Sequence, residues 1–378
     1  MTELLGHAGG RTGWDEWLYV VAPLALFALV VGGLAALGRS AGEGPGLVRL
    51  LRRIPGALER FTGLPGWVAA PVGTGVFALL VAVIGFYWDV AWHIDFGRDK
   101  QLFTPPHTMI VVGLLLIVVT AAVEVLFATL QRADTRLRWK SVRIPYSALP
   151  LAALGLGALS GFPLDDVWHH FYGVDVTMWG PTHLIMIAGA SFTPIALWLV
   201  LAEAGIRPGD GHAARLAHVV LAVATLTGLS TFQGEFDFGV PQFQLLYHPV
   251  LIAAAAGAGL VAARLVLGAG GALVAAVGFI ALRAGLAALI GSALGLTPPH
   301  FPLYLAAAVG VELAARIVRA RWSLRFGVAA GLAAGTLGVA GEWAAVAAWG
   351  RHPWTLSLLP HAAMLSVLAA ATAAVVGT

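Results

Sequence analysis

The residues best suited to chemistry occur in a pattern that is repeated after 76 positions. Each copy places one Asp before two His residues at the same spacing: Asp89, His93 and His107, then Asp165, His169 and His183. An Asp and a His four residues apart lie on one face of a helix, and a second His after a short loop can complete a set of three metal ligands. The pattern therefore predicts two metal sites, each with one carboxylate and two imidazoles.

Two helices and a loop must position each set of ligands. Asp89 and His93 follow a long apolar run, so they are expected one turn beyond the membrane-spanning part of a helix. Pro105 can start the next helix, which places His107 in its first turn at the same depth. A His at a helix N-terminus lies near the positive end of the helix dipole, which favours the neutral imidazole that a metal requires. The same argument applies to the second copy.

Further candidates surround these six residues. Asp99 and Asp175 occupy matching positions in the two loops, where a carboxylate can orient a ligand or move a proton. Thr297-Pro-Pro-His300 repeats Thr104-Pro-Pro-His107 letter for letter, and the pattern returns in weaker form elsewhere. The additional candidate ligands are Glu235, His248, His300 and His361. Glu342, His352 and His361 are a further candidate polar cluster.

The composition indicates a membrane protein. The 378 residues are 59% hydrophobic and 11% charged, and their mean hydropathy is +0.86. So little charge cannot keep a domain of this size in water, so long apolar runs are expected to be membrane-spanning helices. The absence of cysteine excludes thiolate metal sites, iron–sulfur clusters and disulfides. The basic pI near 9.5 is explained by residues that set topology, and no nucleic-acid partner is expected.

The expected fold is an all-α polytopic membrane protein of about eleven spans. A short outer segment is expected at 1–16. A membrane region at 17–205 carries the duplicated motif, and a membrane region at 206–378 carries the weaker motifs. The expected spans are 17–37, 67–88, 107–131, 146–163, 182–204, 214–233, 247–267, 270–294, 301–319, 325–348 and 356–377. Residues 49–60 are expected to form an amphipathic helix on the inner membrane surface.

Basic residues predict the orientation of these spans. Loops on one side hold 17 of the 22 Lys and Arg residues, so this side is expected to be cytoplasmic and the N-terminus outside. Ten of the twelve His residues then fall on the outer side, with both metal motifs. Glu124, Arg283 and Glu312 lie within spans, where a charge needs a partner, and Arg283 is expected to pair with Glu312.

The first motif resembles the C subunit of the particulate methane and ammonia monooxygenases, which are copper-containing membrane enzymes. The similarity covers about residues 66–205 and is carried by Asp89-Val-Ala-Trp92-His93, Arg98-Asp99 and Phe103-Thr104-Pro105-Pro106-His107. It implies copper ligands at Asp89, His93 and His107. The family's second triad begins with Asn, where this chain has Asp165.

The resemblance implies a copper-binding membrane protein that is a monooxygenase, or a subunit of one, and oxidises small apolar substrates with dioxygen. Asp89, His93 and His107 would then form the catalytic site, beside companion membrane or periplasmic subunits or a second copy of the chain. Zinc suits the same ligands as copper. Two other functions stay open: a membrane protein for metal transport or acquisition, and a haem-binding electron carrier.

Overall fold

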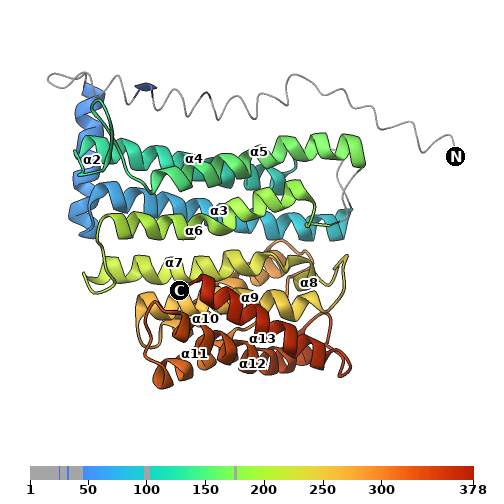
Figure 1. Cartoon of the computed structure of the whole chain (residues 1–378). Helices are drawn as coiled ribbons and strands as arrows, with labels where there is room; N and C mark the ends of the chain where they lie inside the picture. The colour runs from blue at the N-terminus through green and yellow to red at the C-terminus, as the bar shows by residue number, and fades with distance from the viewer. Residues whose placement is uncertain (1–24, 26–31, 34–45, 98–102, 174–176) are drawn as a thin grey trace, which may run out of the picture. The chain divides into compact units, whose positions relative to one another are not determined.

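The computed structural model describes residues 25, 32–33, 46–97, 103–173 and 177–378, and these residues are mainly helical (Figure 1). Asp99 and Asp175 lie outside the described residues, as does nearly all of the first expected span. The chain divides into two compact units. Unit 1 contains the residues up to Val83 and Thr108–Ala214, and unit 2 contains Ile84–His107 and Arg215–Thr378.

Nine helices in the described part of the chain are long and apolar enough to cross a membrane. They are α3 (Gly66–Phe96), α4 (Pro105–Leu130), α5 (Ala148–Tyr172), α6 (Pro181–Glu203), α7 (His212–Thr231), α9 (Tyr247–Leu267), α10 with its π-helical continuation η1 (Gly271–Ala288 and Leu289–Ala293), α12 (Leu324–Trp349) and α13 (Leu359–Val376). Helices of this length match the hydrocarbon layer, about 30 Å thick. The chain is therefore an all-α integral membrane protein, as its composition predicts.

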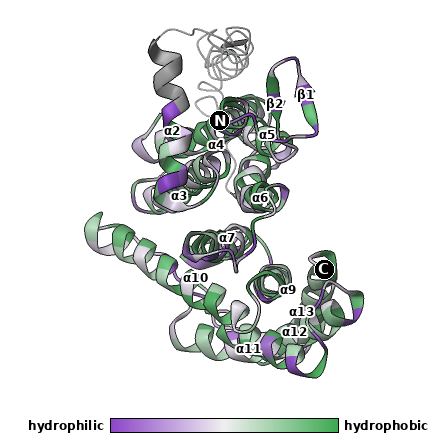
Figure 2. Cartoon of the chain, turned by 90° about the vertical axis from the view of Figure 1, so that its left-hand side faces the viewer, coloured by the Kyte–Doolittle hydropathy of each residue, from purple (hydrophilic) through white to green (hydrophobic). Residues whose placement is uncertain are grey.

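The remaining elements are short. They are α2 (Gly46–Thr62), α8 (Gly234–Phe238), α11 (Leu305–Ile317) and a hairpin of β1 (Leu137–Trp139) and β2 (Val142–Ile144), in which Arg138 pairs with Arg143. The expected helix at 49–60 is present as part of α2. In Figure 2, hydrophobic colouring dominates the helices, and hydrophilic residues appear on α2.

One expected span differs from the structure. Residues 297–304 are not helical, and α11 begins only at Leu305 and has 13 residues. Prolines at 298, 299 and 302 explain this late start, because proline lacks the N–H that a helix interior needs. A helix of 13 residues is about 20 Å long, too short to cross a membrane alone. Thr297-Pro-Pro-His300 therefore does not repeat the helix start that Thr104-Pro-Pro-His107 makes.

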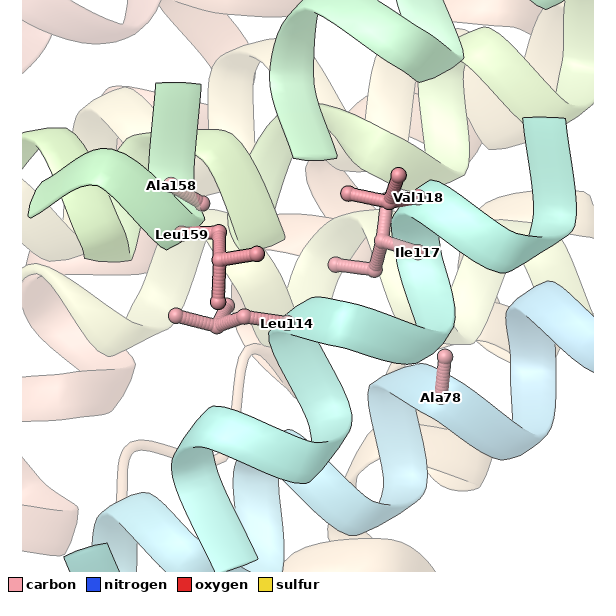
Figure 3. Packing of buried hydrophobic residues seen from close by; sticks show 6 residues of the cluster. All are labelled: Ala78, Leu114, Ile117, Val118, Ala158 and Leu159. Atoms are coloured by element: carbon pink, nitrogen blue, oxygen red, sulfur yellow. The ribbon is translucent and has the colours of Figure 1, made fainter. Parts of the chain in front are cut away.

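Small residues bring the helices of unit 1 close together. A buried cluster joins α3, α4 and α5 through Ala78, Leu114, Ile117, Val118, Ala158 and Leu159 (Figure 3). A Cβ atom added at Gly155 would lie 2.9 Å from the backbone nitrogen of Val118, and one at Gly113 would lie 2.6 Å from that of Ala82. Such close approach is typical of helices that associate in lipid, where packing replaces the hydrophobic effect. This packing holds the helices that carry the motifs.

In unit 2, α9, α12 and α13 pack against one another, and α11 lies against α12 (Figure 1). The buried cation of this unit corrects one prediction. Arg283 is 0% exposed and pairs with Asp237 of α8, with its Nη2 atom 2.6 Å from Oδ2. Glu312 instead pairs with Arg264, at 2.9 Å. The predicted pair of Arg283 with Glu312 is therefore wrong, because α8 brings a closer carboxylate to α10.

Candidate metal centres

The first triad forms where α3 ends and α4 begins, and all three of its residues belong to unit 2. Asp89 Oδ1 lies 3.1 Å from His107 Nε2, and Asp89 Oδ2 lies 3.6 Å from His93 Nε2. The two imidazole centroids are 5.4 Å apart. The spacing predicted that these side chains converge, and the structure places them together.

The second triad repeats this arrangement in unit 1, where α5 ends and α6 begins. Asp165 Oδ1 lies 3.3 Å from His183 Nε2, and Asp165 Oδ2 lies 3.7 Å from His169 Nε2. The imidazole centroids are 6.0 Å apart. The aspartate therefore lies between two imidazoles in both triads, and each of its oxygens faces one of them.

Both triads have the dimensions of a metal site. In each, one ligand atom from every residue lies within 4.8 Å of the other two. Metal–ligand bonds of about 2.0–2.2 Å to nitrogen and oxygen place two ligands of one ion roughly 3–4 Å apart, depending on geometry. The carboxylate–imidazole distances of 3.1–3.7 Å fall within that range.

Backbone carbonyl groups orient one imidazole in each triad. The Nδ1 atom of His93 lies 3.3 Å from the carbonyl oxygen of Gly97, and that of His183 lies 3.0 Å from the carbonyl oxygen of Thr177. A carbonyl oxygen only accepts, so Nδ1 must carry the proton in both residues. In the neutral imidazole the Nε2 atom, which faces the aspartate, then has the lone pair that a metal ligand needs.

Two polar atoms of the triads are buried without a hydrogen bond in the described part of the chain. They are Asp89 Oδ1 and His169 Nε2. Buried polar atoms normally have a hydrogen-bond partner, so each such atom calls for an explanation. A cation in each triad would supply one, because it would accept the lone pair of Asp89 Oδ1 in the first triad and that of His169 Nε2 in the second. The donor set and these two atoms therefore fit a metal ion.

One difference separates the two triads. The hydroxyl group of Thr182 donates a hydrogen bond to Asp165 Oδ1. The matching position of the first triad is Pro106, whose side chain has no donor. The carboxylate of the second triad is therefore held by a neighbouring side chain on α6, and that of the first triad has no corresponding hydroxyl.

A glycine follows the first helix of each motif at the same position. Gly97 follows α3 with a φ of +82°, and Gly173 follows α5 with a φ of +83°. This left-handed conformation disfavours residues with a Cβ atom, so glycine is required where each chain leaves its helix. Pro105 and Pro181 then begin α4 and α6. The same glycine after the first helix and the same proline at the start of the second therefore accompany the approach of the two His residues in each triad.

The weaker motif at Glu235 and His248 has other contacts. Glu235 is buried and its Oε2 atom accepts the backbone N–H of Gln242 at 2.9 Å. The His248 ring stacks on Phe236 at 4.5 Å, and its Nδ1 atom accepts the indole N–H of Trp354 at 3.1 Å. These two candidate ligands are held separately by their neighbours and belong to no group of three ligands that the described residues form.

His300 and the Glu342 cluster also differ from expectation. The Nδ1 atom of His300 bonds to the carbonyl oxygen of Trp349, on whose ring the imidazole stacks. Glu342 accepts the backbone N–H groups of Leu303 and Tyr304. His361 lines a shallow pocket of unit 2. Among the described residues, the groups of three candidate ligands are the two triads alone, so the proposed Glu342 cluster is not formed.

Several residues that shape the sites carry no signal in the sequence. The carbonyl group of Thr177, before α6, and the hydroxyl group of Thr182, in the first turn of α6, contact the second triad. Asp95, within the first motif, accepts hydrogen bonds from the backbone and side chain of Thr297, both at 2.6 Å. This contact joins the end of α3 to a loop about 200 residues later, which only a folded chain can reveal.

Comparisons of the chain with models of protein families, with curated proteins and with solved structures find no match.

Proposed function

We propose that the chain is a membrane metalloprotein that holds one ion in each Asp–His–His triad, with copper as the ion. The observation that carries this proposal is the same preformed donor geometry at two places in the chain, 76 residues apart. For nitrogen and oxygen donors, copper(II) binds more tightly than zinc or the other common divalent metals. Zinc is the alternative ion, since it takes the same donors.

We propose further that the first triad is catalytic and that the protein is a monooxygenase, or a subunit of one, for small apolar substrates. Three protein ligands leave an open coordination position, as in catalytic sites, whereas structural sites are usually closed by a fourth ligand. Bound copper supplies the activation of dioxygen. Asp89 and the two imidazoles would hold the ion, the Gly97 carbonyl would fix the orientation of the His93 ring, and the apolar helices would concentrate a lipid-soluble substrate.

The proposed location of both triads is the extracytoplasmic side, with the N-terminus outside. The loop between α4 and α5 supports it. This loop carries Arg132, Arg136, Arg138, Lys140 and Arg143, and it lies at the ends of α4 and α5 opposite the triads. Basic loops stay cytoplasmic, so the triads face outward. Companion subunits or a second copy of the chain complete the proposed assembly in the bilayer.

The geometry disfavours the two other functions. A haem iron held by two His residues has its macrocycle between them, but the carboxylate of Asp89 lies between His93 and His107 and is 3.1 Å from the latter. A transport path would use the charged groups within the spans. Arg283 is bound to Asp237 and Glu312 is bound to Arg264, so these two groups serve as structural pairs. Glu124, the third charged group of the spans, belongs to no group of three metal ligands among the described residues.

Metal analysis of protein purified from its native membrane tests this proposal. We expect two copper ions per chain, an electron paramagnetic resonance signal typical of nitrogen and oxygen ligands, and oxygen consumption that depends on a reductant and a small alkane or alkene. A chain that binds neither copper nor zinc would overturn the metal sites. Two bound ions without substrate-dependent oxygen consumption, in the complete native assembly, would overturn the oxygenase and keep the metal sites.

Removal of the hydroxyl of Thr182 is expected to weaken only the second site. Groups that hold a metal ligand typically contribute 10–100-fold to affinity, so Thr182→Val should raise the dissociation constant of the second ion by about 10–100-fold. Calorimetric titration of copper into metal-free protein measures both sites. Thr193→Val is the matched control, because the Thr193 hydroxyl bonds to the Gly189 carbonyl within α6. Equal loss at both sites, or no loss, would contradict the assigned role.

A further inference from the structure

A buried carboxyl group of α4 lies near the N-terminal end of α5, whereas the second triad is at the C-terminal end of α5. Glu124 of α4 is 0% exposed. The hydroxyl group of Ser147, the residue before α5, contacts Glu124 Oε1 and also lies 2.8 Å from Oε2 of Glu203, the last residue of α6. From Ser147 to Asp165 the helix rises by about 27 Å, so this cluster is separate from the metal ligands.

The hydrogen bonds around Ser147 determine how many protons the cluster holds. A serine hydroxyl has one hydrogen, so Ser147 can donate to only one of the two carboxyl groups. Glu203 also accepts the backbone N–H groups of Tyr146 and Ser147, at 2.9 and 3.0 Å. Glu203 therefore has backbone donors directed at both of its oxygens, and we assign the single Ser147 hydrogen to Glu203 as well. The remaining contact, between Ser147 and Glu124, therefore needs its hydrogen from Glu124.

The surroundings of Glu124 agree with this assignment. Its Oε2 atom is buried and makes no hydrogen bond within the described part of the chain. Burial of an ionised carboxylate without donors is costly, whereas a protonated carboxyl group tolerates it. The charged group that acts electrostatically on Glu124 is Glu203, of the same sign. No ion pair involves either residue among those described, so a proton, and no cationic side chain, reduces the repulsion.

We infer that Glu124, Ser147 and Glu203 form a proton-binding site that holds one proton and one negative charge between two carboxyl groups. Glu203 is half-buried and forms the solvent-facing end, whereas Glu124 forms the buried end. When the Glu124 O–H bond breaks, its proton passes to Ser147 Oγ as the Ser147 proton passes to Glu203. This transfer leaves Glu124 ionised and Glu203 protonated, so a proton can enter or leave the interior of unit 1. The inference is independent of the metal sites.

Infrared spectroscopy of the full chain in detergent tests this inference. At neutral pH we expect a C=O stretching band of a protonated carboxylic acid, which shifts to lower frequency in heavy water. Glu124→Gln should remove the intensity of one carboxylic acid per chain from this band. Glu59→Gln is the control, because Glu59 is an exposed carboxylate that accepts from Gln131. An unchanged band in the Glu124 variant would overturn the site.

Two further variants keep the test decisive if Glu124→Gln does not fold. Glu203→Gln should retain the band, because Glu124 stays buried and protonated. Loss of the band in this variant would place the proton on Glu203 and overturn the assignment. Ser147→Ala should shift the band, because the Glu124 hydroxyl loses its acceptor. A band with the same frequency in that variant would show that Ser147 does not bridge the two carboxyl groups.

Discussion

Asp89→Ala is expected to abolish copper binding at the first triad and to leave the second ion in place. Asp89 is the residue that contacts both imidazoles of its triad, so its removal takes away one of three ligands and the group between the other two. Loss of a group that only orients a ligand costs about 10–100-fold in affinity, so loss of the ligand itself should cost more than about 100-fold. Copper content per chain and calorimetric titration measure the change.

Asp165→Ala should have the mirror effect, and the variant with both substitutions should bind neither ion. Asp134→Ala is the matched control, because Asp134 is a fully exposed carboxylate that pairs with Arg138 on the surface of the protein. Retention of both ions in the Asp89 variant would eliminate the first site. Loss of both ions in that variant would show that the triads do not bind metal independently, contrary to the expected retention of the second ion.

Among the proposed substitutions, Arg283→Met is expected to lower the free energy of unfolding most. Arg283 and Asp237 are both 1% exposed at their side chains, and the guanidinium carbon lies 3.7 Å from the centre of the Tyr87 ring. Removal of one partner of a buried ion pair leaves an uncompensated charge and typically costs about 3–5 kcal/mol. Chemical unfolding in mild detergent, followed by circular dichroism, measures the free energy of unfolding.

A second substitution and a control accompany this variant. Asp237→Asn in the Arg283→Met chain should restore most of the stability, because the buried charge is gone and Tyr87 keeps an oxygen to bond. Arg325→Met, at an exposed position of α12, should change stability by less than about 0.5 kcal/mol. If the single and double variants are equally unstable, the ion pair is not the source of the effect.

The instability of Arg283→Met should also depend on pH. Burial raises the pKa of Asp237, and the guanidinium of Arg283 opposes that rise. Without Arg283 the folded chain must keep this carboxyl protonated, whereas the unfolded chain releases the proton above its ordinary pKa of about 3.9. The unfolded chain then binds fewer protons, so stability falls as pH rises from that value through the raised pKa. Unfolding at a series of pH values measures this slope.

The geometry of the triads could be predicted from the sequence because every contact in them is local. Asp89 and His93 are four residues apart on one helix, and Pro105 begins the next helix just before His107. Helical periodicity, glycine at the turn and proline at the helix start act within a few residues, so the repeated pattern was sufficient to bring the ligands together. The apolar composition was equally sufficient for the all-α membrane fold.

Only the tertiary structure decided which distant charges meet. The sequence suggested Glu312 as the partner of Arg283, because both lie within expected spans. In the structure Arg283 pairs with Asp237, which is 46 residues earlier. Ser147 meets Glu203 across 56 residues, and Thr297 meets Asp95 across 202. Such pairs depend on how close helices pack and on where short segments such as α8 and residues 297–304 fold back. Residue type and spacing do not predict those positions, because each position depends on contacts with residues from the whole unit.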